Sequence, residues 1–255
     1  MLIAIDVGNT NLDIGLFSDN ELKVHWCLST NNRKTEDEYG LQLRELLRSI
    51  QIDTTSVTGI IISCVVPPLQ PVLEKMGKKY FDVTPITVGP GVKTGLNIRS
   101  DNPKEVGSDR IVNAVAAIEE YSVPLIIVSV GTATTFCYID EKCLYMGGVI
   151  APGPGVSADA LYKEASKLPL VEMSKPKRMI GKNTVDALQS GLFYGFIGQV
   201  EGVLYRLKHE VKSNPTVVAT GRYSDVVAEA ANSVDRVDPH LTLKGLHYIY
   251  QKNMS

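Results

Sequence analysis

A glycine-bearing turn near the start of the chain carries residue types that bind phosphate. It runs from Asp6 to Asn11 as Asp-Val-Gly-Asn-Thr-Asn, between the β-branched segment 2–5 and a second apolar segment, 14–17. This pattern predicts a β-hairpin. Its glycine and backbone N–H groups can approach a polyphosphate, and Asp6 can face Mg²⁺. The alternative is an ordinary Asn- and Gly-rich hairpin turn without a ligand.

An internal repeat favours the phosphate interpretation. Residues 125–139 align with residues 2–16 at a constant offset of 123 residues, so Ser129 is the equivalent of Asp6 in the second copy. The second turn, Gly131-Thr-Ala-Thr-Thr135, offers another phosphate cradle at the corresponding place. Two such hairpins in two lobes predict a nucleotide cleft between the lobes.

A third motif, Gly107-Ser-Asp-Arg110, stands at the start of a predicted helix. A carboxylate at Asp109 can accept a substrate proton during phosphoryl transfer, and Arg110 can bind a carboxylate with two hydrogen bonds. Two plainer interpretations stay open. Asp109 is then a helix N-terminal carboxylate favoured by the helix dipole, and Arg110 an exposed side chain bonded to Glu105.

The elements that must position these motifs alternate between strand and helix, which indicates the α/β class. Amphipathic periodicity predicts helices over 36–50 and 109–120. A longer helix is expected from a cap at Asn183 or Thr184 to about His209. Segment 88–102 is rich in Gly, Pro, Asn and Ser and predicts a long loop.

Four glycines follow one side of the long predicted helix. Steps of four, three and four residues separate Gly191, Gly195, Gly198 and Gly202. Each glycine weakens a helix by ~1 kcal/mol relative to alanine, so a stripe of them favours close approach of another backbone over chance. We therefore expect a helix-to-helix contact along this stripe, and a contact between subunits is one form of it.

Length and composition limit the function classes. The chain has 255 residues, with 28 acidic and 26 basic side chains and a net charge of −2. Neither sign forms a long run, so we expect small-molecule partners and no nucleic acid or membrane. The apolar runs are shorter than a signal peptide or a membrane span needs. The four cysteines form no C-x-x-C pair. We expect two lobes and a cytoplasmic location.

Further motifs carry a resemblance to a known family. They are Glu36-Asp-Glu-Tyr-Gly40, Pro90-Gly-Val-Lys-Thr-Gly-Leu-Asn97, Gly147-Gly-Val-Ile-Ala-Pro-Gly153, Gly181-Lys-Asn-Thr184 and Leu241-Thr-Leu-Lys-Gly245. Together with both hairpins and Gly107–Arg110, the set resembles type III pantothenate kinase along essentially the whole chain. That family belongs to the actin-like ATPase superfamily of sugar kinases, acetate kinases and chaperones. The resemblance implies a duplicated actin-like, ribonuclease H-like α/β fold, with lobes over 1–120 and 121–255 and a nucleotide cleft between them.

The resemblance also implies an activity and its residues. The activity is ATP-dependent phosphorylation of (R)-pantothenate on its primary hydroxyl to 4′-phosphopantothenate, the first step of coenzyme A synthesis. Asp109 matches the catalytic base, and Asp6 the residue that holds Mg²⁺ through water. The implied ATP and phosphate contacts are Asp6, Val7, Gly8, Asn9, Thr10, Asn11, Leu12, Asp13, Gly131 and Thr132. The implied pantothenate contacts are Ser100, Gly107, Ser108, Asp109, Arg110 and, from a neighbouring subunit, Thr184.

A homodimer with the pantothenate pocket at its subunit interface is therefore expected. Thr184 also has a plainer interpretation as a helix cap, and it can serve both roles only if its hydroxyl is shared.

Three positions depart from the family pattern. The family's second hairpin begins Asp-Phe-Gly, whereas Ser129 and Val130 precede Gly131 here. The missing carboxylate is the family's ligand for a monovalent cation, K⁺ or NH₄⁺, so weaker cation binding is expected. Ser100 stands where relatives commonly have a pantothenate-contacting tyrosine. Arg222 stands where a second glycine is usual near the adenosine site.

These departures leave alternatives to a working pantothenate kinase. One is a catalytically weak or inactive paralogue with a metabolite-binding or regulatory role. Another is a sugar or acetate kinase on the same fold, which is less favoured because fold alone does not set the substrate. The kinase is favoured because four residues of the expected site are retained: Asp6, Asp109, Arg110 and Thr184.

Overall fold

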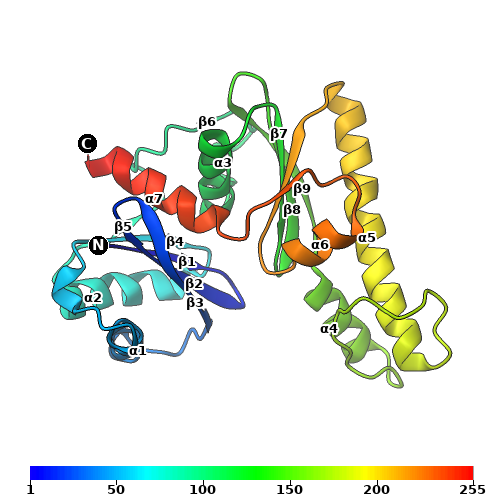
Figure 1. Cartoon of the computed structure of the whole chain (residues 1–255), viewed down its shortest axis with the longest axis horizontal. Coiled ribbons are helices and arrows are strands. Elements are labelled where there is room, and N and C mark those ends of the chain that lie inside the picture. Colours follow the sequence, from blue (N-terminus) through cyan, green and yellow to red (C-terminus); the bar gives the residue numbers. More distant parts are fainter. Residues whose placement is uncertain (255) are drawn as a thin grey trace. The chain divides into compact units, whose positions relative to one another are not determined.

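The computed structural model describes residues 1–254 and divides the chain into two compact units (Figure 1). Unit 1 contains Met1–Leu96, Asp101–Glu119 and the chain from Leu241 onwards. Unit 2 contains Asn97–Ser100 and Glu120–His240. Strands and helices alternate in both units, so the predicted α/β class is confirmed.

Unit 1 is built on a five-stranded sheet in the order β3-β2-β1-β4-β5. The strand β1 lies antiparallel to β2 and parallel to β4. The strands are β1 (Leu2–Val7), β2 (Asn11–Ser18), β3 (Glu21–Ser29), β4 (Gly59–Cys64) and β5 (Ile86–Thr87). The α-helices are α1 (Glu36–Ser49), α2 (Gln70–Phe81), α3 (Ser108–Glu120) and α7 (Leu241–Met254). Short 3-10 turns occur at Thr54–Ser56, Pro67–Leu69 and Pro103–Glu105.

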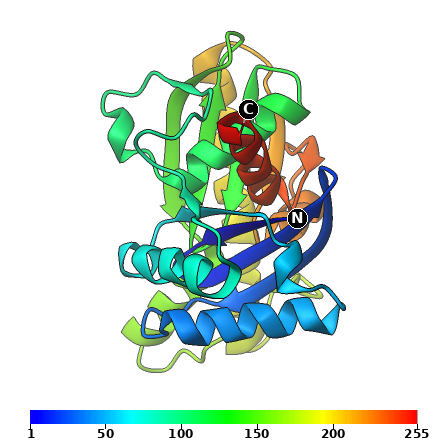
Figure 2. The ribbon, with the colours of Figure 1, turned by 90° about the vertical axis from the view of Figure 1, so that its left-hand side faces the viewer.

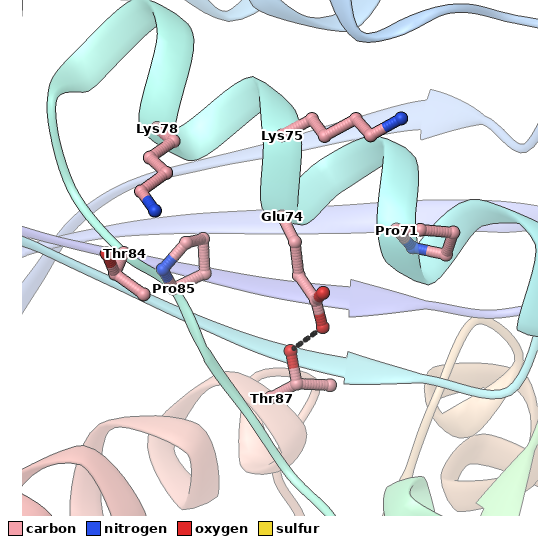
Figure 3. A pocket seen from close by; sticks show the side chains of 7 residues that line it. All are labelled: Pro71, Glu74, Lys75, Lys78, Thr84, Pro85 and Thr87. Atoms are coloured by element: carbon pink, nitrogen blue, oxygen red, sulfur yellow. Dashed lines mark hydrogen bonds between the residues drawn. The ribbon is translucent and has the colours of Figure 1, made fainter.

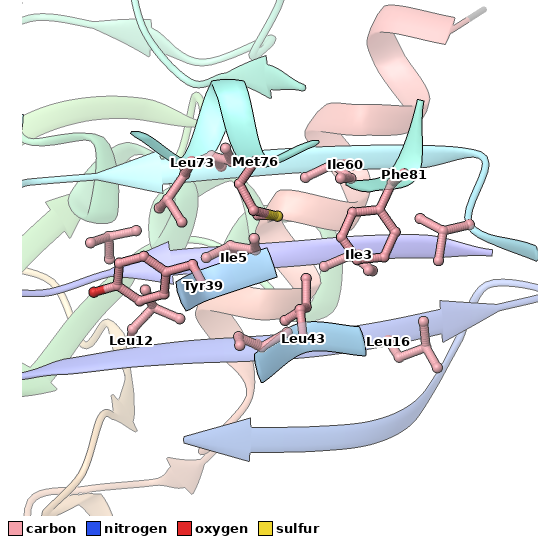
Figure 4. Close-up of a cluster of buried hydrophobic side chains, with 14 of the residues drawn as sticks. Ile3, Ile5, Leu12, Leu16, Tyr39, Leu43, Ile60, Leu73, Met76 and Phe81 are labelled. Carbon is pink, nitrogen blue, oxygen red and sulfur yellow. The ribbon is translucent and has the colours of Figure 1, made fainter. Parts of the chain in front are cut away.

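Helices cover both faces of this sheet because side chains alternate between faces along each strand. Ile3 and Ile5 of β1 pack with Leu43 of α1 and Leu73 of α2, and Figure 4 shows this core. Figure 2 shows α1 and α2 side by side. The intervening residues of β1, such as Ala4, share the opposite core with α3 and α7. Asp6 lies on that second face, which brings a carboxylate towards α3.

Unit 2 is built on a six-stranded sheet in the order β11-β10-β7-β8-β9-β6. Its strands are β6 (Asn97–Ile98), β7 (Leu125–Val130), β8 (Ala133–Ile139), β9 (Leu144–Pro152), β10 (Thr216–Thr220) and β11 (Arg236–Val237). Its helices are α4 (Pro154–Glu164), α5 (Thr184–Val211) and α6 (Ser224–Ala230). The apolar face of α5, with Phe193, Phe196 and Val200, packs against β7 and β10 residues such as Val128 and Val217.

The two units repeat one arrangement of three strands. In each, a hairpin is joined by a parallel strand on its other side, giving β2-β1-β4 and β8-β7-β10. The constant offset of 123 residues is wrong beyond the turn, because the second hairpin is one residue shorter. Asp6 pairs with Asp13, whereas Ser129 pairs with Thr135. Ser129 has the place of Asp6 in the second hairpin. Its paired residue is Thr135, and not Phe136 as the constant offset would require.

The C-terminal helix α7 packs in unit 1, although the sequence-based division puts residues 241–255 in the second lobe. Leu246 and Ile249 of this helix are buried in the core that contains Ala4. Gly245 allows the close packing, since a Cβ there would lie 2.1 Å from the backbone oxygen of Val112 on α3. This contact joins residues more than a hundred positions apart and has no local sequence signal.

Candidate active site

A row of polar side chains crosses the second face of the unit 1 sheet. Asp6 of β1 is in register with Asp13 of β2 on one side and with Ser63 of β4 on the other. Paired residues point to the same face of a sheet, so the three side chains are neighbours. Asp13 is also tied to β3, because the Asp13 Oδ1 lies 2.9 Å from the His25 Nε2.

Asp6 is an unusual carboxylate because one of its oxygens is buried without a partner. Within residues 1–254 its Oδ1 accepts no hydrogen bond. Burial raises the pKa of Asp6 to about 7, and the charges of Asp109 and Asp13 add to the rise, against a hydrogen bond from Ser63. A carboxylate in this condition is stabilised by a cation placed beside it.

The row continues into the start of α3. The hydroxyl oxygens of Ser63 and Ser108 lie 3.0 Å apart. Asp109 follows Ser108 and is half-buried, and its carboxylate accepts the backbone N–H of Arg110. Burial raises the pKa of Asp109 despite that hydrogen bond and the Arg110 charge. A raised pKa suits a general base, because it strengthens the affinity of the carboxylate for a proton.

Gly107 provides the space for the Asp109 carboxylate. A Cβ at Gly107 would lie 2.5 Å from the Asp109 Oδ1. A side chain at position 107 would therefore displace the Asp109 carboxylate, which turns back over the start of the helix.

The first hairpin turn is held by a residue that sequence reasoning missed. The Gly8 N–H donates to the Asn11 oxygen over 2.9 Å, which closes the turn. The Thr30 hydroxyl donates to the Gly8 oxygen over 2.7 Å, and the Thr30 N–H to the Thr10 oxygen over 2.9 Å. Thr30 follows β3, and no local motif distinguishes it. Asn9 and Thr10 remain exposed at the tip of the turn.

Two other residues of that predicted phosphate segment point elsewhere. The side chains of Val7 and Leu12 are buried in the core that faces α1 and α2. Only their backbone groups are therefore available to a ligand at the turn.

The second turn lies in unit 2 and is crowded by backbone. A Cβ at Gly153, where β9 meets α4, would lie 2.1 Å from the Gly131 oxygen and 2.6 Å from the Thr132 oxygen. The Gly153 N–H donates to the same Thr132 oxygen over 3.0 Å. Gly221, after β10, has φ +87°, and a Cβ there would lie 2.7 Å from the Val130 oxygen. Glycines from two other segments therefore shape this turn.

Ser129 lies in a row that corresponds to the row of Asp6. It pairs with Thr135 of β8 and with Thr220 of β10. The Thr220 hydroxyl is fully buried and has no hydrogen-bond partner among the described residues. The unit 2 row therefore contains hydroxyls only, whereas the unit 1 row contains two carboxylates.

The remaining predicted residues lie in unit 2, apart from Arg110 at the start of α3. The Ser100 hydroxyl oxygen is buried without a partner in the described chain. Thr184 is exposed as the first residue of α5, and the helix is capped by Asn183, whose side chain accepts the Asp186 N–H. The Thr184 hydroxyl is therefore not needed as a cap. Arg222 is exposed and lies over the Tyr223 ring, 5.6 Å from its centroid.

A separate open groove of about 470 Å³ lies between α2 and β5 (Figure 3). Glu74 lies inside it and accepts a hydrogen bond from Thr87 over 2.8 Å. Lys75 and Lys78, also on its lining, are exposed. None of the predicted site residues lines this groove.

The donor set fits a hydrated Mg²⁺ better than a closed metal site. No three His, Cys, Asp or Glu side chains gather as a metal-binding group within residues 1–254. Mg²⁺ usually keeps several waters and takes one or two carboxylates, which the unpartnered Asp6 oxygen and its neighbour Asp13 can supply.

Among residues 1–254, no helix has both the length and the apolar character of a membrane span.

The sequence is similar to those of one known protein family. Residues 2–206 match the family model of type III pantothenate kinase. The type III pantothenate kinase of Bacillus cytotoxicus is 54% identical over 253 residues, which cover 99% of this chain and 97% of the relative.

Solved structures with lower identity support the fold. A conserved Campylobacter jejuni protein, described as a Baf family transcriptional activator, aligns with a TM-score of 0.62 at 18% identity, covering 99% of this chain and 98% of that one. The activator of 2-hydroxyisocaproyl-CoA dehydratase from Clostridium difficile, solved with bound ADPNP, aligns with a TM-score of 0.57 at 11% identity, covering 98% and 94%. The prediction of an actin-like ATPase fold is confirmed.

Proposed function

Because this chain belongs to the type III pantothenate kinase family, we propose that it phosphorylates pantothenate with the row of Asp6, Ser63, Ser108 and Asp109 as its catalytic face. Pantothenate kinase activity, at the start of coenzyme A synthesis, follows from the family, and ATP is the phosphoryl donor. The assignment of residues to that activity is the proposal. Its main support is the half-buried Asp109 carboxylate, whose pKa is raised and whose space depends on Gly107.

In the proposed reaction, Asp109 accepts the proton of the primary hydroxyl of pantothenate. The hydroxyl oxygen forms a bond to the γ-phosphorus of ATP, and the bond from that phosphorus to the β–γ bridging oxygen breaks. The products are 4′-phosphopantothenate and ADP, and the proton on Asp109 returns to water. Positioning and charge neutralisation supply the rest of the catalysis.

We assign the substrate contacts by their chemistry. Arg110, next to the base, binds the pantothenate carboxylate with two parallel hydrogen bonds. Ser100, Gly107 and Ser108 contact the rest of pantothenate. The turns at residues 6–13 and at Gly131–Thr132 bind the nucleotide phosphates through backbone N–H groups and exposed side chains.

Two cations belong to the proposal. Asp6 would hold Mg²⁺ through water, and the ion would neutralise phosphate charge. The monovalent-cation position falls at Ser129, where only the hydroxyls of Ser129, Thr135 and Thr220 are at hand. Since hydroxyls carry no charge, we expect K⁺ or NH₄⁺ to bind weakly there.

We also propose a homodimer in which Thr184 contributes to the partner's pantothenate pocket. Gly191, Gly195 and Gly198 of α5 meet no atom within 4 Å of an added Cβ, so their own chain does not use the stripe. Large exposed apolar side chains lie on α4, before α5 and in its first turn: Val156, Leu161, Tyr162, Leu170, Met179, Ile180 and Val185. Such residues favour burial against another subunit. A cytoplasmic location, where ATP is present, completes the proposal.

The role of Asp109 is tested by Asp109→Asn. We expect the variant to fold and to bind nucleotide, while pantothenate phosphorylation falls at least ~100-fold, the usual contribution of a general base. ADP release with pantothenate, or with sugars and acetate as controls, measures the activity. Glu36→Gln, which alters a carboxylate in the first turn of α1, is the matched control and should keep wild-type turnover.

Near wild-type turnover of Asp109→Asn would remove Asp109 from the mechanism. If the wild-type chain binds pantothenate but phosphorylates nothing, the inactive-paralogue interpretation replaces the kinase.

A further inference from the structure

The last turn of α7 holds two segments that are far away in the sequence. The Lys252 Nζ lies 2.7 Å from the Glu119 Oε1, at the end of α3. The Asn253 side chain donates to the Lys93 oxygen over 3.0 Å and accepts the Lys93 N–H over 3.1 Å. One amide thus satisfies both backbone groups of Lys93, as a neighbouring strand would.

These two contacts fall at the ends of a single stretch, residues 93–119. Within it lie the proposed pantothenate contacts, from Ser100 to Arg110, and all of α3 up to Glu119. Within this stretch the chain passes from unit 1 to unit 2 after Leu96, returns to unit 1 at Asp101 and leaves it again after Glu119. The last turn of α7 therefore contacts unit 1 close to the first of these crossings, at Lys93, and directly before the last, at Glu119.

The beginning of the stretch has few hydrogen bonds of its own, although Val92 and Leu96 pack against the core that contains Ile249 of α7. Apart from the two bonds of Lys93 to Asn253, the hydrogen bonds between Gly89 and Leu96 are local, from the Val92 N–H to the Gly89 oxygen and from the Leu96 N–H to the Thr94 hydroxyl. Gly95 has φ +73°, and the Lys252 side chain lies 3.6 Å from where its Cβ would be. The long-range hydrogen bonds of residues 89–96 thus come from α7, whereas the next residues, Asn97 and Ile98, pair with β9.

We propose that Lys252 and Asn253 are positioning residues for pantothenate, because they fix both ends of the stretch that carries Ser100, Gly107 and Asp109. The inference rests on the proposed function of that stretch. Neither side chain touches the reacting atoms. They act by limiting the conformations of residues 93–107 and by fixing the far end of the helix that begins beside Asp109.

The same turn provides a matched control. The Gln251 Nε2 donates to the Asn20 Oδ1 over 2.7 Å, a long-range side-chain bond of the same kind. Asn20 belongs to the turn between β2 and β3 and not to the 93–119 stretch. Gln251→Ala therefore removes an α7 anchor without releasing the pantothenate segment.

Steady-state kinetics test the proposal on the full-length chain. Asn253→Ala and Lys252→Ala should each raise the pantothenate KM about three- to tenfold, with the ATP KM and kcat changed less than about twofold, since uniform binding is lost and chemistry is not. Lys252→Arg should restore a near wild-type KM, because it keeps the ion pair. Gln251→Ala should leave the pantothenate KM unchanged. An equal rise in Gln251→Ala, or no rise in Asn253→Ala, would overturn the proposal.

Hydrogen exchange gives a readout that does not depend on activity. Backbone amides of residues 93–107 should exchange faster in Asn253→Ala than in wild type or Gln251→Ala. Unchanged exchange would refute the positioning role even if activity fell. If the wild-type chain lacks pantothenate kinase activity while exchange rises as expected, the proposed function fails and the anchoring role of α7 stands.

Discussion

Two carboxylates of unit 1, Asp6 on the sheet and Asp109 at the start of α3, differ in their surroundings. Asp6 and Asp109 both have raised pKa values because both are buried, but only Asp109 is held by backbone N–H groups. Asp6 keeps an oxygen without a partner among the described residues. A hydrogen-bonded carboxylate beside a substrate suits proton transfer, and an unpartnered one suits a cation. The separation of base and cation roles thus follows from the local contacts of each residue.

Ser129→Asp tests the lost carboxylate at the same scale. We expect the wild-type chain to respond weakly to K⁺, and the variant to gain both activity and K⁺ dependence, because a carboxylate holds a monovalent cation more firmly than hydroxyls do. The gain should be limited to about a few-fold, since Ser100 and Arg222 are unchanged and a buried charge without its cation is costly.

Pantothenate phosphorylation is measured for both proteins across a K⁺ series, with Na⁺ holding ionic strength constant. Strong K⁺ activation of the wild-type chain would show that the row of Ser129, Thr135 and Thr220 suffices as it is, and would contradict this account.

At the scale of elements, α5 shows two unlike faces. Phe193, Phe196 and Val200 are buried against the unit 2 sheet, whereas Gly191, Gly195 and Gly198 face open space. A helix that kept four glycines for packing within its own unit would show close neighbours at each. The open stripe therefore supports the proposed contact with a second subunit.

Gly195→Leu separates that contact from folding. A Cβ added at Gly195 meets no atom within 4 Å outside the backbone of its own helix, so the monomer should stay folded with an unchanged or slightly higher helix content. In a dimer packed through the stripe, the larger residue should cost ~1 to 3 kcal/mol or more. Sedimentation velocity at micromolar concentration should show a dimer for wild type and a shift towards monomer for the variant. A variant that sediments as wild type, or a monomeric wild type, would exclude this interface.

For the whole molecule, the two units have the same strand arrangement but differ in the charge of their polar rows. The unit 1 row contains Asp6 and Asp13, and the unit 2 row contains only hydroxyls. We propose that residues 1–120 and 121–255 are the two copies of the duplication. In this division α7 belongs to the second copy by sequence but packs in unit 1. The carboxylates of these rows all lie in unit 1. Ionisation of Asp6 should therefore lower the stability of the unliganded protein.

The pKa of Asp6 gives that effect a sign. Its value rises from the ordinary 3.8 to about 7 in the folded chain, so the folded state binds the proton more firmly than the unfolded state does. The stability that this proton contributes is present below pH 3.8 and is lost as the pH rises through about 7. Without nucleotide or Mg²⁺, Asp6→Asn should therefore raise the unfolding temperature more at about pH 8 than at about pH 5, because only part of that stability has been lost at the lower pH.

Thermal unfolding at both pH values measures the difference, at about 2 to 4 °C for each kcal/mol in a chain of this size. Asp19→Asn, at an exposed carboxylate in the turn after β2, is the control variant. An equal effect of Asp6→Asn at the acidic and the alkaline pH would contradict the raised pKa.

Much of the site could be predicted from local sequence. Hairpin turns, amphipathic helices and the Gly107–Arg110 motif depend on residues a few positions apart, and the structure has each of these elements where the pattern indicated it. The α/β class and the repeated hairpin were visible for the same reason. Turn chemistry and side-chain periodicity are short-range properties, and the sequence by itself determined them.

Only the tertiary structure decided which residues surround those motifs. Strand register and chain crossings bring four residues to the two hairpins, and no local pattern indicates these positions. The residues are Ser63, Thr30, Gly153 and Thr220. The shorter second hairpin, the burial that raises the pKa of Asp6, and the packing of α7 in unit 1 likewise depend on contacts between distant segments. Local patterns determine where elements begin and end, whereas register and burial arise only when those elements pack together.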